Sequence, residues 1–250
     1  MNHNQLIIFD LDDTLVDTSD VYWRARKSFV EVLQTEQFNS EMVIDVFEEI
    51  DSLNMEKLGF SPRRYMKSML ETYEKILLKY KRRSCNQTLD NIKSCGRIVL
   101  EQLPQPIEGA RDLLEWASAH FKLAILTRGE NEFQRRKLHY SSLLKYFNFV
   151  QVVTTKDSNK FAGVIKDAGF CSKDTWIIGD SIKSDINPGI ELAAKCILYV
   201  YTHHTYYWRQ EYGFPADGSF YMIYELNKAI DILKSPQSFE MVSELPDERV

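Results

Sequence analysis

The spacing of hydrophobic and polar positions divides the chain into two kinds of sequence. Short runs of apolar and β-branched residues are predicted as strands at residues 6–10, 122–127, 149–154, 175–179 and 195–201. Near-continuous apolar strands are typical of a parallel sheet that is buried on both faces. Because helix-length stretches separate the later runs, the pattern predicts right-handed βαβ units. We therefore expect an α/β protein with a doubly wound, Rossmann-like parallel sheet.

The long segment between the first two strands has a different pattern. It shows helical periodicity and little strand signal, and helices are predicted at residues 19–36, 40–57, 62–82 and 87–102. The stretch LPQPIEG at 103–109 then contains two prolines and a glycine, which favour a loop that returns the chain to the sheet. We expect an all-helical domain at residues 17–106, inserted into a core made of residues 1–16 and 107–250.

Composition and charge narrow the range of partners. The formal net charge of -5 gives no general attraction to nucleic acid or to an anionic membrane. No apolar run approaches the roughly 20 residues that span a bilayer, and MNHNQLIIFD lacks the features of a signal peptide. The four cysteines are scattered and show no metal-ligand spacing. We expect a cytoplasmic protein with no nucleic-acid or membrane partner; the sequence carries no sign of an oligomeric state.

Polar residues gather where the predicted strands end. In open α/β sheets, ligands bind beyond the carboxyl ends of the strands. The residues at those ends are Asp10, Asp12 and Thr14 after the first strand, Thr127 after the second, Lys156 after the third, and Asp180 and Asp185 after the fourth. Carboxylates, a hydroxyl and an ammonium group are therefore expected at one edge of the sheet.

These residue types suit phosphoryl transfer with a divalent cation. Mg²⁺ prefers carboxylate oxygens and keeps several waters, so Asp10 and Asp180 are candidate ligands, with a backbone carbonyl near Asp12. An aspartate beside the cation can attack phosphorus, while Asp12 can protonate the leaving oxygen and later activate water. Thr127 would then bind the phosphoryl oxygens and Lys156 would neutralise charge.

The stretches DLDDT, LTRG, TTKDSNKF and GDSIKSD occur in this order, each close to the end of a predicted strand. Together they resemble the four motifs of the haloacid-dehalogenase-like hydrolase superfamily, over residues 1–16 and about 107–200. The helical insert is similar to that family's cap of the first kind. The resemblance implies a magnesium-dependent phosphatase of small phosphorylated metabolites. It makes Asp10 the nucleophile, Asp12 the acid and base, Asp180 a metal ligand, and Asp185 a ligand or its orienting neighbour.

Two positions depart from the family pattern. Lys156 is followed by Asp157 where many members have proline, and Lys160 is a competing candidate; Lys156 is preferred because it adjoins the strand. Arg128 follows the motif threonine where asparagine is common. Arg128 could contact a second anionic group of the substrate, or it could pair with Glu130 at the surface.

Other candidates are less specific. Thr14 and Arg63 join Arg128 as candidate substrate contacts. Arg63 or Arg64 in GFSPRRY could bind an anionic group, although solvated charges at a helix start are the simpler interpretation. Asp13 and Asp17 are expected to be exposed or to cap a turn. Gly179 is expected to permit a tight turn, and the aromatic segment 201–208 is expected to pack against the core or line an edge.

Three other functions remain open at this point. A phosphomutase uses the same aspartates and differs mainly in its cap. A phosphorylated signalling protein also combines aspartates, threonine, lysine and magnesium, but it lacks an inserted helical domain. A non-catalytic binding protein would not need the full set of side chains. A dehalogenase is disfavoured, because its chemistry needs no metal that binds phosphate.

Overall fold

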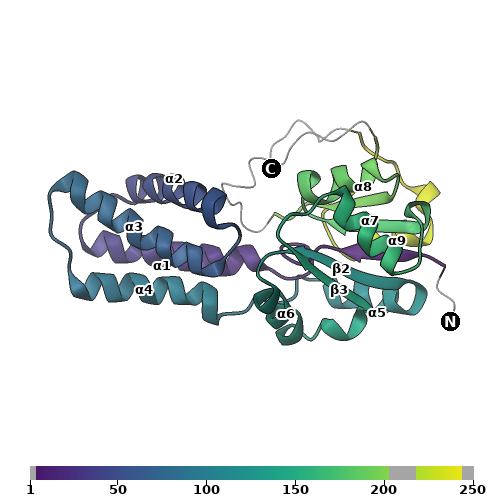
Figure 1. The fold of residues 1–250 in the computed structure, drawn as a ribbon, viewed down its shortest axis with the longest axis horizontal. Helices are drawn as coiled ribbons and strands as arrows, with labels where there is room; N and C mark the ends of the chain where they lie inside the picture. The colour runs from purple at the N-terminus through teal and green to yellow at the C-terminus, as the bar shows by residue number, and fades with distance from the viewer. Residues whose placement is uncertain (1–3, 203–217, 244–250) are drawn as a thin grey trace. The chain divides into compact units, whose positions relative to one another are not determined.

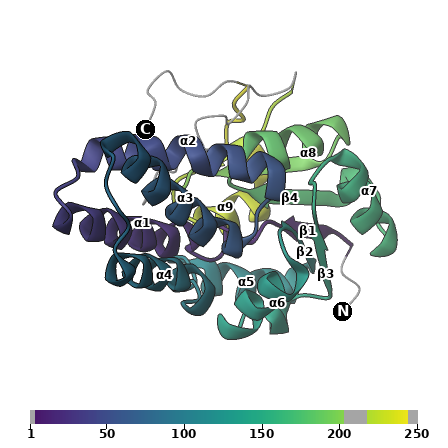
Figure 2. The ribbon, with the colours of Figure 1, turned by 60° about the vertical axis from the view of Figure 1, so that its left-hand side comes forward.

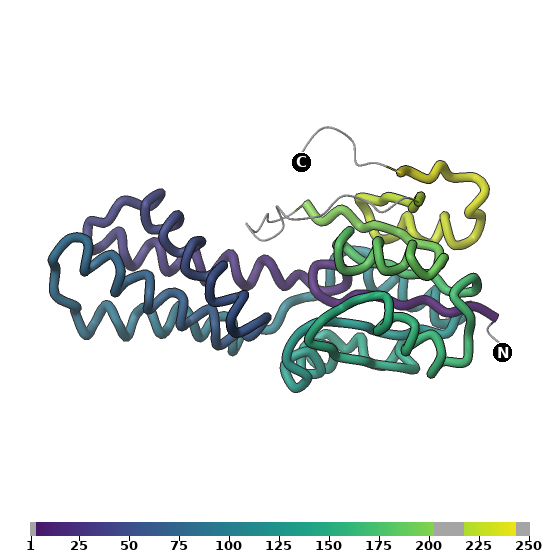
Figure 3. Tube along the Cα trace, turned by 45° about the horizontal axis from the view of Figure 1, so that its top comes forward, coloured from purple at the N-terminus to yellow at the C-terminus, as the bar shows by residue number. Residues whose placement is uncertain are grey.

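The structure is a computed structural model, and it describes residues 4–202 and 218–243. The described chain separates into two compact units. One, the helical unit, is Thr18–Pro104; the other, the α/β unit, comprises the residues up to Asp17 and those from Gln105 onward. Figure 3 shows the chain leaving the first strand for the helical unit and returning to the α/β unit afterwards. No helix in the described ranges is long and apolar enough to cross a membrane.

The α/β unit is built on a parallel sheet. Its strands in the described chain are β1 (Leu6–Phe9), β2 (Lys122–Arg128), β3 (Phe149–Val153), β4 (Thr175–Gly179), β5 (Lys195–Tyr199) and β6 (Tyr221–Ile223), arranged in the order β3-β2-β1-β4-β5-β6. All neighbouring pairs are parallel, and β1 lies between β2 and β4. The direction of strand addition therefore reverses at β1, which is the kind of position where such sheets bind ligands. The predicted α/β class is confirmed.

Helices cover both faces of this sheet (Figure 1). The helices of the unit are α5 (Ala110–His120), α6 (Asn131–Tyr140), α7 (Ser158–Asp167), α8 (Asn187–Glu191) and α9 (Lys228–Lys234), with a π-helical turn η3 (Ile182–Ile186) and short 3₁₀ turns at Leu144–Tyr146, Ser172–Asp174 and Pro236–Ser238. One core contains residues of α5, α6 and α9 with Ile7 and Phe9; the other contains residues of α7, η3 and α8 with Leu6 and Ile8. Since successive side chains of β1 enter opposite cores, the strand must be apolar throughout.

The helical unit consists of α1 (Thr18–Thr35), α2 (Ser40–Leu58), α3 (Pro62–Tyr80) and α4 (Asn86–Glu101). Helix α1 packs on α4, and α3 packs on both α2 and α4 (Figure 2). An aromatic cluster closes the interior: the Phe47 ring lies 5.7 Å from that of Phe29 and 5.1 Å, edge to face, from that of Tyr65. Such ring pairs add to the stability gained from burial of apolar surface. The helix and strand bounds predicted from the sequence agree with the structure to within two residues.

The C-terminal part of the α/β unit was not predicted. Strand β6 has only three residues, and helix α9 is a seven-residue helix, so neither gives a periodic signal long enough to read. Of the aromatic segment 201–208, the residues from 203 lie outside the described ranges. Tyr201 is buried and its hydroxyl donates to Asp17 Oδ1 at 2.5 Å. Asp17 is therefore the partner of a core tyrosine, within the same unit.

Candidate active site

The carboxyl end of β1 carries two of the candidate acids. Asp10 is almost fully buried, and its backbone N–H donates to the carbonyl of Ile178 on β4 at 2.9 Å, which continues the sheet pairing by one residue. The chain then turns, and Asp13 N–H donates to the Val16 carbonyl at 2.7 Å. Asp13 has a φ of +59°, a left-handed conformation that Asp tolerates better than most residues. Asp13 was expected to be exposed or to cap a turn; it lies in this turn, and it is buried.

Lys156 joins the ends of three strands. It lies just beyond β3, and its Nζ is 2.5 Å from Asp10 Oδ1 and also forms an ion pair with Asp185. All three side chains are buried. Lys160 is placed differently: it lies within α7, and its backbone N–H donates at 3.1 Å to Asp157, the residue that caps this helix. Of the two lysines, Lys156 is the one whose ammonium group reaches the aspartates.

Burial and neighbouring charges shift the pKa values of this cluster. Burial raises the pKa of Asp10 from 3.8 to about 7; the Lys156 ammonium opposes this shift, while the charges of Asp185 and Asp12 add to it. For Lys156, burial alone would lower the pKa, but the carboxylates of Asp10 and Asp185 outweigh it and leave the pKa raised. Burial is therefore the main cause of the raised pKa of Asp10, and Lys156 offsets only part of it.

The end of β4 supplies the other two acids. Asp180 follows the strand and accepts a hydrogen bond from Thr14 Oγ1 at 3.3 Å. Asp185 lies on the π-helical turn η3, and its Oδ2 accepts from the Ser181 N–H at 3.2 Å. A Cβ atom on Gly179 would lie only 2.3 Å from Cγ of Asp185. The glycine is therefore needed for the close approach of the carboxylate, and not for the tight turn that we expected, since its φ is not positive.

Two residues at this edge were missed by the sequence reasoning. Gln134 and Lys137 project from α6, and their side chains are almost fully buried. The Gln134 amide donates to Thr127 Oγ1 at 2.7 Å and to Asp12 Oδ2 at 2.6 Å, and Lys137 Nζ lies 2.5 Å from Asp12 Oδ1. Together with buried Leu138, they occupy positions i, i+3 and i+4 of one helical stripe. The signal in the sequence was a glutamine and a lysine on the stripe of the helix that should face the core, which indicates buried polar partners.

Arg128, the last residue of β2, faces the acidic edge. Burial lowers the pKa of its guanidinium, and the negative charges of Asp10, Asp185, Asp180 and Asp12 oppose that shift, with Asp10 the strongest of the four. The arginine therefore stands in the electrostatic field of all four acids. It remains partly accessible to solvent.

The two arginines of GFSPRRY differ in their surroundings. Arg63 is exposed in the first turn of α3. Arg64 is only 2% exposed and forms an ion pair with buried Asp51 of α2. Ser68 donates a hydrogen bond to the same carboxylate at 2.6 Å. Neither a solvated nor a substrate-binding role fits Arg64, because it completes a buried polar cluster within the helical unit.

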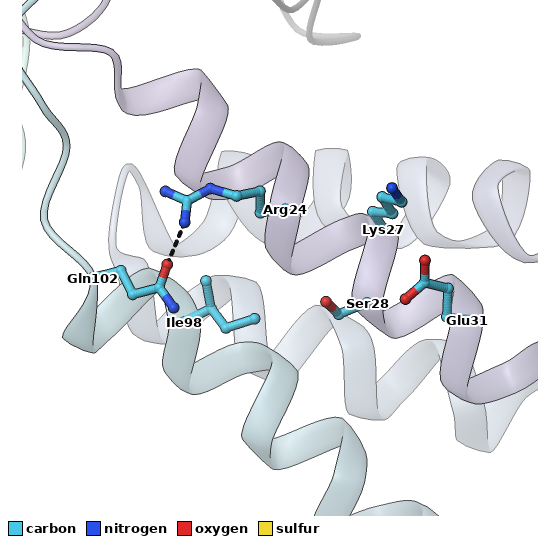
Figure 4. A pocket seen from close by; sticks show the side chains of 6 residues that line it. All are labelled: Arg24, Lys27, Ser28, Glu31, Ile98 and Gln102. Atoms are coloured by element: carbon cyan, nitrogen blue, oxygen red, sulfur yellow. Dashed lines mark hydrogen bonds between the residues drawn. The ribbon is translucent and has the colours of Figure 1, made fainter.

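The helical unit also contains a shallow groove of about 290 Å³ between α1 and α4 (Figure 4). Six residues line it: Arg24, Lys27, Ser28, Glu31, Ile98 and Gln102. Arg24 is already engaged there, since it donates to Gln102 Oε1 at 2.6 Å and to Asp20 at 2.8 Å. None of the candidate site residues lines this groove.

The carboxyl edge of the sheet presents the kind of donors that a magnesium ion takes. Within the described ranges, no three His, Cys, Asp or Glu side chains form a group that could by itself hold a metal ion. Mg²⁺ rarely needs such a cage, because one or two carboxylates, waters and substrate phosphate complete its octahedron. The donors at the edge are carboxylate oxygens, and a cation there would favour the charged form of Asp10, whose pKa is raised mainly by burial. The residues therefore fit the ion.

Comparison with known proteins gives the family. A model of the haloacid dehalogenase-like hydrolases matches residues 7–199, and the chain belongs to this family of hydrolases. It is 24% identical to human N-acylneuraminate-9-phosphatase over 204 residues, which cover 78% of this chain and 81% of that protein.

Solved structures share the fold. A haloacid dehalogenase-like family hydrolase from Xanthomonas campestris has a TM-score of 0.73 at 23% identity, over 94% of this chain and 97% of that one. The HAD-hydrolase YfnB from Bacillus subtilis, whose structure is bound to magnesium, has a TM-score of 0.62 at 20% identity, over 93% and 99% of the two chains. At these identities the likeness concerns the fold.

Proposed function

We propose that this protein is a magnesium-dependent phosphatase that hydrolyses a small phosphomonoester through an aspartyl-phosphate. The observation that carries the proposal is the contact between Lys156 and Asp10 at the end of the central strand. A carboxylate paired with a buried ammonium group supports the proposal, because phosphoryl transfer needs positioned charge at the reacting atoms. The phosphatase similar to this chain over four-fifths of its length supports the same class of reaction.

Each side chain then has a role in a balanced two-step reaction. An oxygen of Asp10 attacks phosphorus, the bond from phosphorus to the leaving oxygen breaks, and Asp12 gives its proton to that oxygen. In the second step, Asp12 takes a proton from water as the water attacks the aspartyl-phosphate. Phosphate leaves and the Asp10 carboxylate is restored. Thr127 binds a phosphoryl oxygen throughout, and Lys156 neutralises charge on Asp10 and on the transferred group.

The acids would also hold the cation. Asp10, Asp180 and Asp185 supply carboxylate oxygens, and Asp12 contributes through its backbone carbonyl, since its own carboxylate is bonded to α6. Thr14 supports this set through its hydrogen bond to Asp180. When bound, Mg²⁺ supplies positive charge that stabilises the phosphoryl oxygens.

The helical unit is proposed to act as the cap that selects the leaving group. In this assignment residues 17–106 are the cap domain, and residues 1–16 with 107–250 are the catalytic core. Arg63, exposed in the first turn of α3, and Arg128, at the acidic edge, are the proposed contacts for further anionic groups of the substrate. The expected substrate is a small phosphorylated metabolite.

Phosphate release is the direct test. The protein is assayed with Mg²⁺ against a panel of phosphorylated metabolites, beside Asp10→Asn and the matched control Asp13→Asn, which changes a neighbouring buried carboxyl in a conformation that Asn also tolerates. We expect turnover by the wild type and by the control, and loss of all turnover in Asp10→Asn. Metal-dependent turnover that persists in Asp10→Asn contradicts the assignment of the nucleophile. An isomerised product without free phosphate identifies a phosphomutase instead.

A further inference from the structure

Asp12 is held on both of its carboxylate oxygens by one helix. Lys137 Nζ lies 2.5 Å from Oδ1, and Gln134 Nε2 donates to Oδ2 at 2.6 Å. The Lys137 side chain is 4% exposed, against 27% for Asp12. The donors are thus buried beneath the carboxylate, which itself reaches the accessible edge of the sheet.

Gln134 links the Asp12 carboxylate to strand β2 by hydrogen bonds. The same amide nitrogen that donates to Asp12 is 2.7 Å from Thr127 Oγ1 and 2.9 Å from the carbonyl of Arg128. Gly129 leaves room for it: a Cβ atom there would lie 3.2 Å from the Gln134 side chain, and its φ of +148° disfavours other residues. One buried amide therefore fixes the separation between Asp12 and the hydroxyl of β2.

Stability does not account for this arrangement. A glutamine and a lysine on the buried stripe of a helix must be desolvated, and apolar residues of similar size are often equally or more stabilising at such positions. Leu138, on the same stripe, shows that an apolar side chain fits this face of α6. Gln134 and Lys137 are better explained by their contacts with the Asp12 carboxylate.

We propose that Gln134 and Lys137 are positioning residues, which fix the orientation of Asp12 so that its proton meets the leaving oxygen while Thr127 binds the phosphoryl group. This inference rests on the proposed phosphatase function. Proton transfer contributes about 10² to 10⁴-fold to a rate, and a misplacement of about 1 Å can cost about 10²-fold. Loss of either donor should therefore slow aspartyl-phosphate formation from substrates whose leaving oxygen needs the proton, and spare it for those whose leaving group does not. Hydrolysis of the aspartyl-phosphate, in which Asp12 is the base, is common to all substrates.

The dependence on the leaving group separates positioning from general damage. Lys137→Met and Gln134→Met keep side chains of similar length, and Arg136→Met removes a neighbouring exposed cation of α6 as the matched control. Each is assayed with an alkyl phosphate taken from the phosphate-release panel and with p-nitrophenyl phosphate, whose leaving group is stable as an anion. We compare kcat/KM, which reports aspartyl-phosphate formation and not its hydrolysis. We expect kcat/KM for the alkyl phosphate to fall by about 10²-fold in the two variants, with a fall of only a few-fold for p-nitrophenyl phosphate and no loss in the control.

A double-mutant cycle with Asp12→Asn gives the second readout. If Lys137 acts through Asp12, then Lys137→Met should cost little more once Asp12→Asn is present. Equal losses of kcat/KM on both substrates, or a full additional loss in the Asp12→Asn background, would overturn the positioning role. Wild-type protein that releases phosphate from neither substrate would instead refute the phosphatase proposal itself, which is a different result.

Discussion

Because the pKa of Asp10 is raised in the folded protein, ionisation of this proposed nucleophile lowers the free energy of unfolding. An aspartate with a pKa of about 7 in the folded state and 3.8 when unfolded keeps its proton longer in the folded chain. Its contribution to stability is therefore fully present below about pH 4 and is lost as the pH rises to about 7. About three pKa units at about 1.4 kcal/mol each give a loss of about 4 kcal/mol.

The variant Asp10→Asn isolates this effect. It removes the titrating carboxyl together with its contact to Lys156, but Lys156 has a raised pKa and stays charged over this range, so the lost contact is a constant offset. We expect the free energy of unfolding of the wild type, minus that of Asp10→Asn, to fall by about 3 kcal/mol between about pH 5 and about pH 8. Above about pH 7 the difference should level off.

Urea unfolding in the presence of a chelator measures this difference at each pH. Other carboxylates titrate in both proteins and cancel. Added Mg²⁺ should reduce the pH dependence of the wild type, because a bound cation favours the charged carboxylate. Parallel stability profiles for the two metal-free proteins would show that Asp10 titrates normally, and the argument from buried charge would then be wrong.

Two further predictions concern the helical unit and the thiols. Asp51→Leu should lower the free energy of unfolding by about 3 to 5 kcal/mol by leaving Arg64 buried without its partner, whereas adding Arg64→Met should restore most of the loss in the same urea assay. A disulfide reagent should modify exposed Cys85, whose pKa is lowered by the backbone N–H of Thr88, long before Cys196, whose pKa burial raises to about 12. Mass spectrometry over time checks the order, and early labelling of Cys196 would contradict the packing around it.

The sequence alone predicted those elements whose pattern of apolar residues is local and regular. The apolar runs predicted the central strands, because strands buried on both faces are mostly apolar. The long helices of the insert were also predictable, since their stripes repeat over several turns. The three-residue β6 has no such repetition, and its place at the sheet edge follows from pairing with β5. This pairing depends on the tertiary structure, and the three residues themselves do not indicate it.

For the candidate site, the order of the four motifs along the chain identified the candidate residues, but it did not predict which side chains contact one another. Lys156 was preferred to Lys160 for its place after a strand, and the structure brings that residue to Asp10. Gln134 and Lys137 were overlooked because a polar residue on a short helix is normally solvated. Arg64 was interpreted as exposed for the same reason. In each case the partner lies far away in sequence or on another helix, so only the tertiary structure shows it.

The position of β1 in the sheet has a consequence for synthesis of the chain. Strand β1, which Asp10 follows, is made before the other strands of the sheet, yet Leu6 pairs with Lys122 on one side and with Thr175 on the other. Until β4 has been synthesised, one edge of this apolar strand has no partner strand. The four helices of the helical unit are synthesised before β4, so they can pack on one another earlier. Chains that stop short of β4 should therefore be strong chaperone clients and prone to aggregate. Strand β1, which is buried along its whole length in the folded protein, therefore keeps one edge unpaired until β4 has been synthesised.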